Sequence, residues 1–387
     1  MSTSLSQRMV WFDANRVCAA AGVVLIHSTT DFAGRPFPDA SISERVIPVL
    51  LRSIGEFSGS EMFFLFSLFL LAQRIDRHRP GFREQTVFQA KRLLVPFAFW
   101  TLFYGLFRLI KADVQGYAPQ YLAELSQLKT WVAFFLLGKS QYHMHFLPTL
   151  FAISLFYPVM RLAMRYPMLG VLLFATLGAM NHAQGFLYSI DIAPLVRDYL
   201  VRLTKIFGYV GYGLAAFALY SLWKDGIPRG EARLIRRGAL YLVLLAYLAT
   251  LPFFGPALMT GAFPVRASWD YFGHFLMPLL IFCMFMGSQY ASWSPRWSIA
   301  ARYTFGVYLI HPAVIDLFDI AVIQSGLSQS VSPAMLVLLR FSVALPLALG
   351  LAALIGRVPH LAWTIGLGPT PWARLARRNE IKLVPTT

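Results

Sequence analysis

The chain has 387 residues, of which 57% are apolar, 15% are aromatic and only 13% are charged. Because a soluble domain usually carries roughly 25% charged residues, this composition excludes a soluble globular protein and predicts an all-α bundle of helices in a lipid bilayer. The formal net charge of +16 does not indicate nucleic-acid binding, because the basic residues alternate with apolar runs along the chain instead of forming one patch.

Apolar runs of about the length that crosses a bilayer recur from one end of the chain to the other. Ten of them are predicted to span, at residues 14–31, 47–73, 93–111, 146–164, 168–187, 203–222, 238–258, 270–288, 303–323 and 334–356. The run 130–138 is too short to cross and predicts a re-entrant or interfacial piece. We therefore expect one integral-membrane domain over residues 1–387, with a basic tail at about 357–387.

Lysine and arginine are distributed unevenly among the loops between these runs. Residues 74–92, residues 224–237 and the tail after 357 are rich in them, whereas the alternate loops hold few. Short loops rich in Lys and Arg stay in the cytoplasm. The pattern predicts that both termini are cytoplasmic and that the number of spans is even, which favours ten.

Ionisable side chains inside the apolar runs are the next signal, because each costs about 2.5–3.5 kcal/mol on insertion scales and is a candidate functional group. Several of them have a structural explanation. Arg52 and Glu56 lie four residues apart, a spacing that lets them neutralise each other on one helix face. Arg108, Lys205 and Arg340 could extend towards the membrane surface or form structural ion pairs.

Arg16 and His27 in the first run form a more specific pattern. Eleven residues make about three full helical turns, so both side chains project from one face, about 16 Å apart along the axis. One face of one helix then presents a fixed cation near the predicted cytoplasmic side and a titratable base towards the other side. We interpret this pair as a candidate catalytic feature.

Glu61 is the third candidate catalytic residue. It lies within the second run, and no basic residue stands three or four positions away on the same helix. A buried carboxylate must find a partner on another helix or take up a proton. His27 is the expected partner, because a carboxylate orients an imidazole and raises its basicity; an ion pair that only holds the bundle together is the alternative.

Other polar motifs in the apolar runs have weaker signals. His143 and His145 open the fourth run, but side chains two residues apart on a helix point in different directions, so we predict no metal site. His311 precedes Pro312 in the ninth run. The glycine-rich stretch 208–213 has no strand before it and predicts close packing of helices, not a phosphate loop.

Taken together, these segments resemble the acyltransferase-3 family of membrane acyltransferases, and five of its marks appear in order. Arg16 and His27 match its Arg-x10-His signature. The marks are carried by Arg16 and His27, residues 60–70 with Glu61 at the acidic position, residues 91–96, residues 143–148 and residues 305–312. Among subgroups, the chain is most similar to the stand-alone O-acetyltransferases of surface polysaccharides and lipid-linked glycans.

The resemblance implies an acyl donor and a glycan acceptor. The donor would be cytoplasmic acyl-CoA, with acetyl-CoA expected, and the cations Lys91 and Arg92 would bind it together with Tyr308 and His311. His143 and His145 would contact the acceptor, a hydroxyl of a surface or exported polysaccharide or of a lipid-linked glycan. No metal is expected.

The implied setting is the bacterial cytoplasmic (inner) membrane, which the chain crosses several times. The expected partners are acyl-CoA, the glycan, the lipid bilayer and the machinery of polysaccharide synthesis; nucleic acid is not expected to bind.

Three positions depart from the family pattern. Leu68 stands in place of a Gly, His145 in place of a Trp, and Gln89 in place of the first Arg of a basic pair. These differences concern the acceptor pocket and the donor-phosphate contacts, whereas Arg16 and His27 are unaffected.

The rival interpretation is a glycolipid or exopolysaccharide transporter, which also buries charged groups along its pathway. Such a transporter should show internal repeats, which we do not see in the sequence.

Overall fold

A computed structural model describes residues 9–263 and 272–370 of the chain. The described residues form helices and no strand. The first half comprises α1 Val10–Ser28, α2 Ile42–Gly55, α3 Ser60–His78, α4 Phe82–Val114, α5 Ala118–Leu125, α6 Leu128–Leu137, α7 Phe146–Ser154, α8 Tyr157–Arg165 and α9 Leu172–Ser189. The second half comprises α10 Pro194–Lys224, α11 Arg229–Thr250, α12 Gly255–Thr260, α13 Phe272–Met286, α14 Arg296–Ala301, α15 Thr304–Gln324 and α16 Pro333–Arg357. Short 3₁₀ turns, among them η1 Glu56–Ser58 and η6 Ala362–Ile365, join some of these helices.

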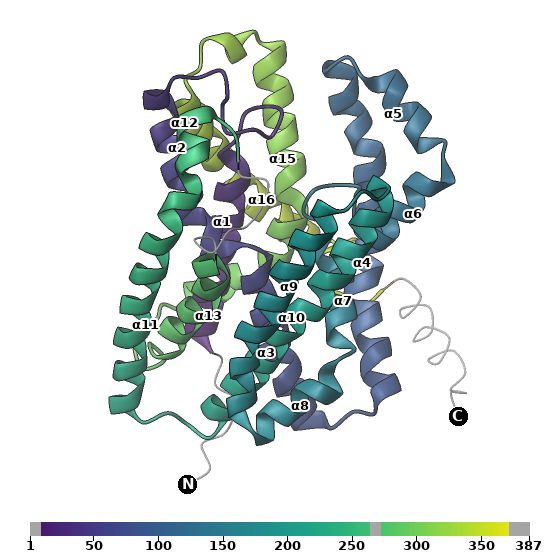
Figure 1. Cartoon of the computed structure of the whole chain (residues 1–387). Coiled ribbons are helices and arrows are strands. Elements are labelled where there is room, and N and C mark those ends of the chain that lie inside the picture. Colours follow the sequence, from purple (N-terminus) through teal and green to yellow (C-terminus); the bar gives the residue numbers. More distant parts are fainter. Residues whose placement is uncertain (1–8, 264–271, 371–387) are drawn as a thin grey trace, which may run out of the picture.

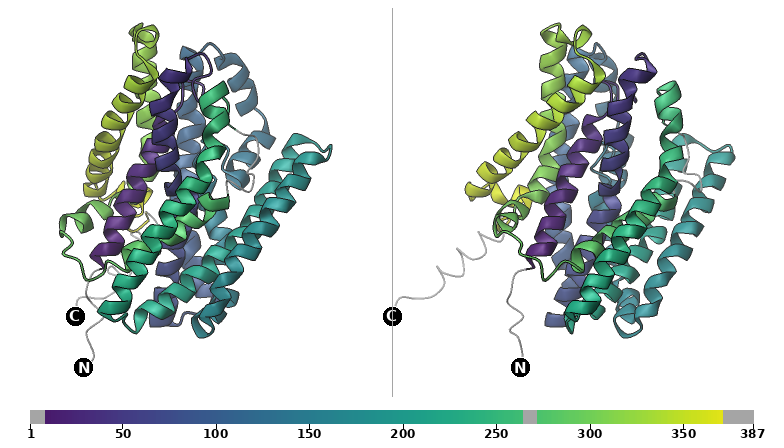
Figure 2. Two further views of the ribbon diagram at one scale, coloured as in Figure 1. Left: turned by 60° about the vertical axis from the view of Figure 1, so that its left-hand side comes forward. Right: turned by 90° about the vertical axis from the view of Figure 1, so that its left-hand side faces the viewer.

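The axes of the long helices are roughly aligned, and the helices form one bundle (Figures 1 and 2). A helix in lipid satisfies its own backbone hydrogen bonds, which is why apolar runs of this length fold this way. In Figure 1, α8 lies near one end of the bundle and α5 near the other. We call the end at which α1 begins the proximal end and the end at which α1 finishes the distal end.

Seven described helical segments are long and apolar enough to cross a membrane. They are Val10–Ser28, Ile42–His78, Phe82–Val114, Pro194–Lys224, Arg229–Thr260, Thr304–Gln324 and Pro333–Arg357. Helices α7 and α8 would count as an eighth together, although their axes meet at 63°. The predicted count of ten is therefore not confirmed: α9 does not meet these limits, and α13 has only 15 residues.

Several local predictions can be compared with this bundle. The short run 130–138 falls in α6, a helix of 10 residues, in agreement with its predicted failure to span. Most of the predicted basic tail, residues 371–387, and the start of the run 270–288 lie outside the described residues. The cytoplasmic location of the termini stays a prediction.

Two glycines of the stretch 208–213 bring α10 close to α9. A methyl group at Gly211 would lie 2.1 Å from Thr176 Oγ1, and one at Gly208 would lie 2.6 Å from Met180 Cβ. Small residues at a helix crossing let backbones approach closely in a membrane. The prediction that this stretch packs helices is thus confirmed.

Two ion pairs lie among these helices, one partly buried and local, the other fully buried and joining α15 to α16. Arg52 Nε lies 2.7 Å from Glu56 Oε2 in the predicted i,i+4 pair. Arg340, only 1% exposed, donates from Nε and Nη2 to Asp319 of α15 at 2.6 and 2.9 Å. It also donates to the carbonyl oxygen of Thr30, which follows α1. This pairing confirms the structural interpretation of Arg340 and fixes the distal end of the helix that carries His27.

Candidate functional site

Helix α1 presents Arg16 and His27 to the interior of the bundle at two different levels. Arg16 lines a cavity near the proximal end, whereas His27 lines two further cavities nearer the distal end. Both side chains therefore project from the side of α1 that faces other helices, as the eleven-residue spacing predicts. The three cavities follow one another along the bundle, and we call them the proximal cavity, the central chamber and the distal cavity.

The proximal cavity has a volume of about 490 Å³ and combines three arginines with apolar walls. Arg16 comes from α1, Arg92 from α4, and Arg302 from the residues just before α15. The walls are provided mainly by Phe63, Phe66, Leu70, Leu93, Phe146, Leu150, Phe305, Ile365 and Leu367. Guanidinium groups bind phosphate oxygens in bidentate fashion, so this cavity suits a ligand with a phosphorylated head and a narrow, apolar or amide-containing arm.

Arg16 is held in place by neighbours from two other elements. Its Nη2 donates to Thr304 Oγ1 of α15 at 3.0 Å, and its Nη1 lies 3.6 Å from Asp13 Oδ1 one turn earlier on α1. Asp13 also accepts a hydrogen bond from Ser298 Oγ at 2.6 Å. This network orients the guanidinium while one carboxylate offsets part of its charge.

The structure separates Lys91 from Arg92, two residues that the sequence assigned to one phosphate-binding cluster. Lys91 lines a different, almost wholly apolar groove on the outside of α4 together with Trp363. Arg74, at the start of the basic segment 74–92, donates to Gln85 at 3.0 Å and stacks 3.6 Å from the ring centre of Phe88. Adjacent residues on a helix point about 100° apart, which is why Lys91 and Arg92 line different cavities in the structure.

The central chamber, of about 260 Å³, is rich in imidazole groups. Four histidines line it, His27, His143, His145 and His274, together with Glu61 and the Arg52–Glu56 pair. It shares Phe63, Phe146 and Tyr308 with the proximal cavity and His27, Tyr142 and His145 with the distal cavity. His27 thus lies between the central chamber and the distal cavity, and Tyr308 lies between the chamber and the proximal cavity.

His311 joins the histidines of the chamber from α15. Its ring stacks on that of His27 with centroids 5.5 Å apart, and His143 lies at the same distance on an edge-to-face contact. His311 is fully buried, with Nδ1 3.0 Å from the carbonyl oxygen of Val307. That contact makes Nδ1 the donor, which leaves Nε2 as an acceptor, and Nε2 has no partner among the described residues.

His143 lies in the turn before α7, where its side chain is 5% exposed. Tyr104 and Tyr308 contact its ring at 5.2 and 5.0 Å, and Tyr308 donates its hydroxyl hydrogen bond to the His143 carbonyl. Burial, followed by the nearby His311 and His27, lowers the pKa of His143 well below its ordinary value. His143 and its neighbour Tyr308 thus lie beside the central chamber.

Glu61 occupies the chamber, but its hydrogen bonds differ from those expected. Its Oε1 accepts from the Tyr209 hydroxyl of α10 at 2.7 Å, and its Oε2 accepts from Ser60 at 3.3 Å. No hydrogen bond joins Glu61 to His27 in the described part of the chain. The structure therefore does not show the expected contact by which Glu61 would orient the His27 imidazole. The rings of His311 and Tyr142 pack against His27 instead.

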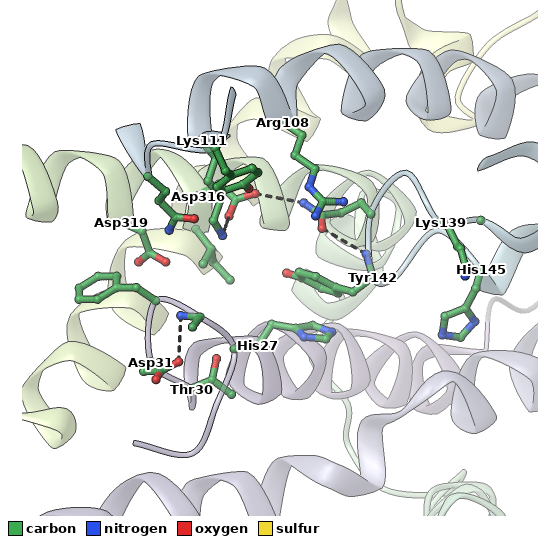
Figure 3. Close-up of a pocket in the computed structure, with 18 of the residues that line it drawn as sticks. His27, Thr30, Asp31, Arg108, Lys111, Lys139, Tyr142, His145, Asp316 and Asp319 are labelled. Atoms are coloured by element: carbon green, nitrogen blue, oxygen red, sulfur yellow. Dashed lines mark hydrogen bonds and ion pairs between the residues drawn. The ribbon is translucent and has the colours of Figure 1, made fainter. Parts of the chain in front are cut away.

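The distal cavity is the largest of the three, at about 530 Å³, and its lining is strongly polar (Figure 3). Lys111 Nζ of α4 donates to Asp316 Oδ1 of α15 at 2.7 Å, and Gln141 Nε2 donates to the other oxygen of Asp316 at 3.0 Å. His27 reaches this cavity from α1, and His145 reaches it from the turn before α7. Such paired charges and amides can exchange hydrogen bonds with a ligand rich in hydroxyl groups.

Sequence reasoning missed three contributors to these cavities. Arg302 lies just before the predicted span 303–323, and its position two residues before α15 brings it to the proximal cavity. Asp316 falls within the predicted span 303–323, but its partners Lys111 and Gln141 lie far away in the sequence. Tyr142 immediately precedes His143, and that adjacency was its only sequence signal.

One family of known proteins matches nearly the whole described bundle. A family model described as an acyltransferase domain, the acyltransferase-3 model, matches residues 9–357. The match includes every helix from α1 to α16 and therefore all the residues of α1, α4 and α15 that line the three cavities. Neither the curated proteins nor the solved structures contain a match to the chain.

Proposed function

The chain belongs to the acyltransferase-3 family, and we propose that it moves an acyl group, acetyl first among the candidates, from acyl-CoA to a hydroxyl group of a glycan, with His27 as the general base. One observation carries this proposal. His27 lies where the central chamber meets the polar distal cavity, and the chamber in turn meets a cavity whose wall presents three arginines.

The proximal cavity suits acyl-CoA. Its phosphates would contact Arg16, Arg92 and Arg302, because a bidentate guanidinium is a strong phosphate ligand. The pantetheine arm is narrow and would run between the aromatic walls towards Tyr308, where the cavity joins the chamber. The thioester carbonyl would then lie in the chamber, within reach of His27.

The distal cavity suits the acceptor. A sugar hydroxyl presented there would reach His27 from the side opposite the thioester. His27 takes the hydroxyl proton as the oxygen attacks the thioester carbon. The carbon–sulfur bond then breaks, and the thiolate leaves and receives the proton, so that the products are an O-acyl sugar and free CoA thiol. In the alternative route, the His27 imidazole first attacks the thioester carbon and releases CoA thiol; the sugar hydroxyl then attacks the acyl-His, so that the carbon–nitrogen bond breaks and the imidazole is regenerated.

Under this proposal the proximal end faces the cytoplasm, where acyl-CoA is made, and the bilayer is the bacterial cytoplasmic membrane. The acceptor would be a surface or exported polysaccharide or a lipid-linked glycan, supplied by the machinery of polysaccharide synthesis. The excess of Lys and Arg in the loops 74–92 and 224–237 supports this orientation.

The test measures release of free CoA thiol by the purified protein in detergent, with acetyl-CoA and a panel of glycans. We expect wild-type release to depend on the glycan. His27→Ala should lower kcat by about 10²-fold or more, the usual contribution of a general base. His78→Ala is the matched control, because His78 is exposed at the end of α3. Wild-type kcat in His27→Ala would overturn the assignment.

Transport of a glycolipid or exopolysaccharide is the rival function, because cavities in series along a bundle also suit the passage of a solute. The two functions differ in chemistry. Movement of a labelled glycan across reconstituted vesicles without release of thiol from acyl-CoA would favour transport and exclude the acyl-transfer proposal.

A further inference from the structure

Tyr142 places an aromatic face beside His27 inside the distal cavity. Its ring centroid lies 4.2 Å from that of His27, with the two planes tilted by 35°. The Tyr142 side chain lines both the distal cavity and the central chamber. It is 44% exposed, which is a large value for a tyrosine in the interior of a bundle. Figure 3 shows Tyr142 reaching across the cavity beside His27.

A chain of hydrogen bonds from two helices fixes the backbone at Tyr142. Lys111 of α4 and Gln141 both donate to the carboxylate of Asp316, at 2.7 and 3.0 Å. The same Gln141 side chain accepts from the Tyr142 backbone N–H through Oε1 at 3.1 Å. Gln141 is thus clamped at both ends of its amide, and the clamp determines where the ring of the next residue lies.

The turn that carries Tyr142 is also restricted at its start. Gly138 ends α6 with φ +69°, and a methyl group there would lie 2.4 Å from His145 Cα. Only glycine adopts this conformation without strain, and only glycine leaves room for His145. Residues 138–145 therefore form a compact turn, with its polar clamp on one side and His27 on the other.

The surroundings of the Tyr142 ring define the chemistry of a ligand that would lie on it. The ring offers an apolar, polarisable face, while the carboxylate of Asp316, the amide of Gln141 and the ammonium of Lys111 line the same cavity. A pyranose has a matching pair of features, because its axial C–H groups form an apolar face and its hydroxyls radiate from the rim. A simple alcohol or a fatty chain would leave the polar groups without partners, which is costly.

We propose that Tyr142 is the platform on which the ring of the acceptor sugar lies, and that the Lys111–Asp316–Gln141 clamp holds this platform so that one sugar hydroxyl faces His27. The inference rests on the proposed function for the identity of the acceptor. Tyr142 is a positioning residue: it takes no proton and forms no bond with the acyl group.

A platform role predicts a selective effect on the acceptor. In Tyr142→Leu the acceptor KM should rise about five- to tenfold, the range expected when an aromatic contact is lost, while the KM for acyl-CoA stays at its wild-type value. Tyr142→Phe keeps the ring and should keep the acceptor KM within about twofold. Gln141→Ala releases the clamp without altering the ring, and it should raise the acceptor KM in the same direction as Tyr142→Leu.

The matched control is Tyr290→Leu. Tyr290 is 53% exposed outside the three cavities, and its hydroxyl donates to the Ile227 carbonyl at 2.7 Å. Both kinetic constants should stay at wild-type values in this variant. An unchanged acyl-CoA KM in Tyr142→Leu also shows that the variant is folded, so that a higher acceptor KM cannot be attributed to misfolding.

Equilibrium binding separates this inference from the proposed function. Maltotetraose, cellotetraose and chitotetraose are titrated into wild-type protein and the variants without acyl-CoA, and the heat of binding is measured. Sugar binding that weakens in Tyr142→Leu supports the platform even if no thiol is released, in which case acyl transfer alone fails. Glycan-dependent thiol release with an unchanged acceptor KM in Tyr142→Leu overturns the platform alone. Failure of the wild-type protein to bind or acylate any of the three sugars also overturns it.

Discussion

Removal of Arg340 alone should destabilise the protein far more than removal of its whole ion pair. Arg340 and Asp319 are 1% and 4% exposed, and two hydrogen bonds of 2.6 and 2.9 Å join them. In Arg340→Met, Asp319 loses its counter-ion in a buried site, where it must stay charged without a partner or take up a proton, and the carbonyl of Thr30 loses its donor. Breaking one side of a buried pair in this way costs about 3–5 kcal/mol.

The double variant Arg340→Met/Asp319→Leu distinguishes this cause from lost packing. It removes both charges, so the free energy of unfolding should recover most of the loss, since apolar replacement of a buried pair is often neutral. Lys139 and Asp198 form the matched exposed pair, with side chains 44% and 40% exposed. Their joint removal should change the free energy by about 0.2–1 kcal/mol.

The assay is unfolding of the purified protein by titration with a denaturing detergent, followed by circular dichroism. The single Arg340 variant should unfold at a clearly lower detergent fraction than the double variant. If the double variant is as unstable as Arg340→Met, the uncompensated charge of Asp319 is not the cause. The loss of the hydrogen bond from Arg340 to the Thr30 carbonyl oxygen would then explain the lower stability.

Three further predictions concern the cavities and their supports. Arg16→Lys loses the planar donor to Thr304 and should raise the KM for acyl-CoA about tenfold with the acceptor KM unchanged; a wild-type KM would reduce Arg16 to a diffuse electrostatic role. Glu61→Gln keeps an acceptor for Tyr209, so kcat should fall less than about tenfold, and a loss as large as that of His27→Ala would restore Glu61 to the proton transfer. Gly211→Val would put a side chain 2.9 Å from Leu173 Cα and should lower the free energy of unfolding by about 1–3 kcal/mol; an unchanged detergent midpoint would contradict close packing of α9 and α10.

The helical fold and the spacing of Arg16 and His27 along α1 could be predicted, because both depend on local sequence patterns. An apolar run of about 20 residues has one stable backbone solution in lipid, and the spacing of Arg16 and His27 follows from helix geometry alone. The span count is harder, because α9 and α13 have the composition of membrane helices without the full length or hydropathy. A hydropathy window does not register where a helix begins, bends or ends.

The partners of buried charges could be predicted only where both members lie on one helix. Arg52 and Glu56, four residues apart, form the expected pair. Glu61 pairs with Tyr209, 148 positions later, and Lys111 pairs with Asp316, 205 positions later. Such contacts depend on how helices pack, and a single sequence holds no record of that packing.

The arrangement of the cavities places a requirement on any acyl transfer in this bundle. The three arginines lie in the proximal cavity, and the mixed charges lie in the distal one. Phe63, Phe146 and Tyr308 line the junction between the proximal cavity and the chamber, where a charged phosphate would be poorly solvated. Under the proposed function, the phosphates of acyl-CoA would therefore stay on the proximal side of this junction, and its uncharged thioester end would approach His27. Donor and acceptor would then meet at the chamber, which is why we expect loss of the His27 side chain to stop the reaction.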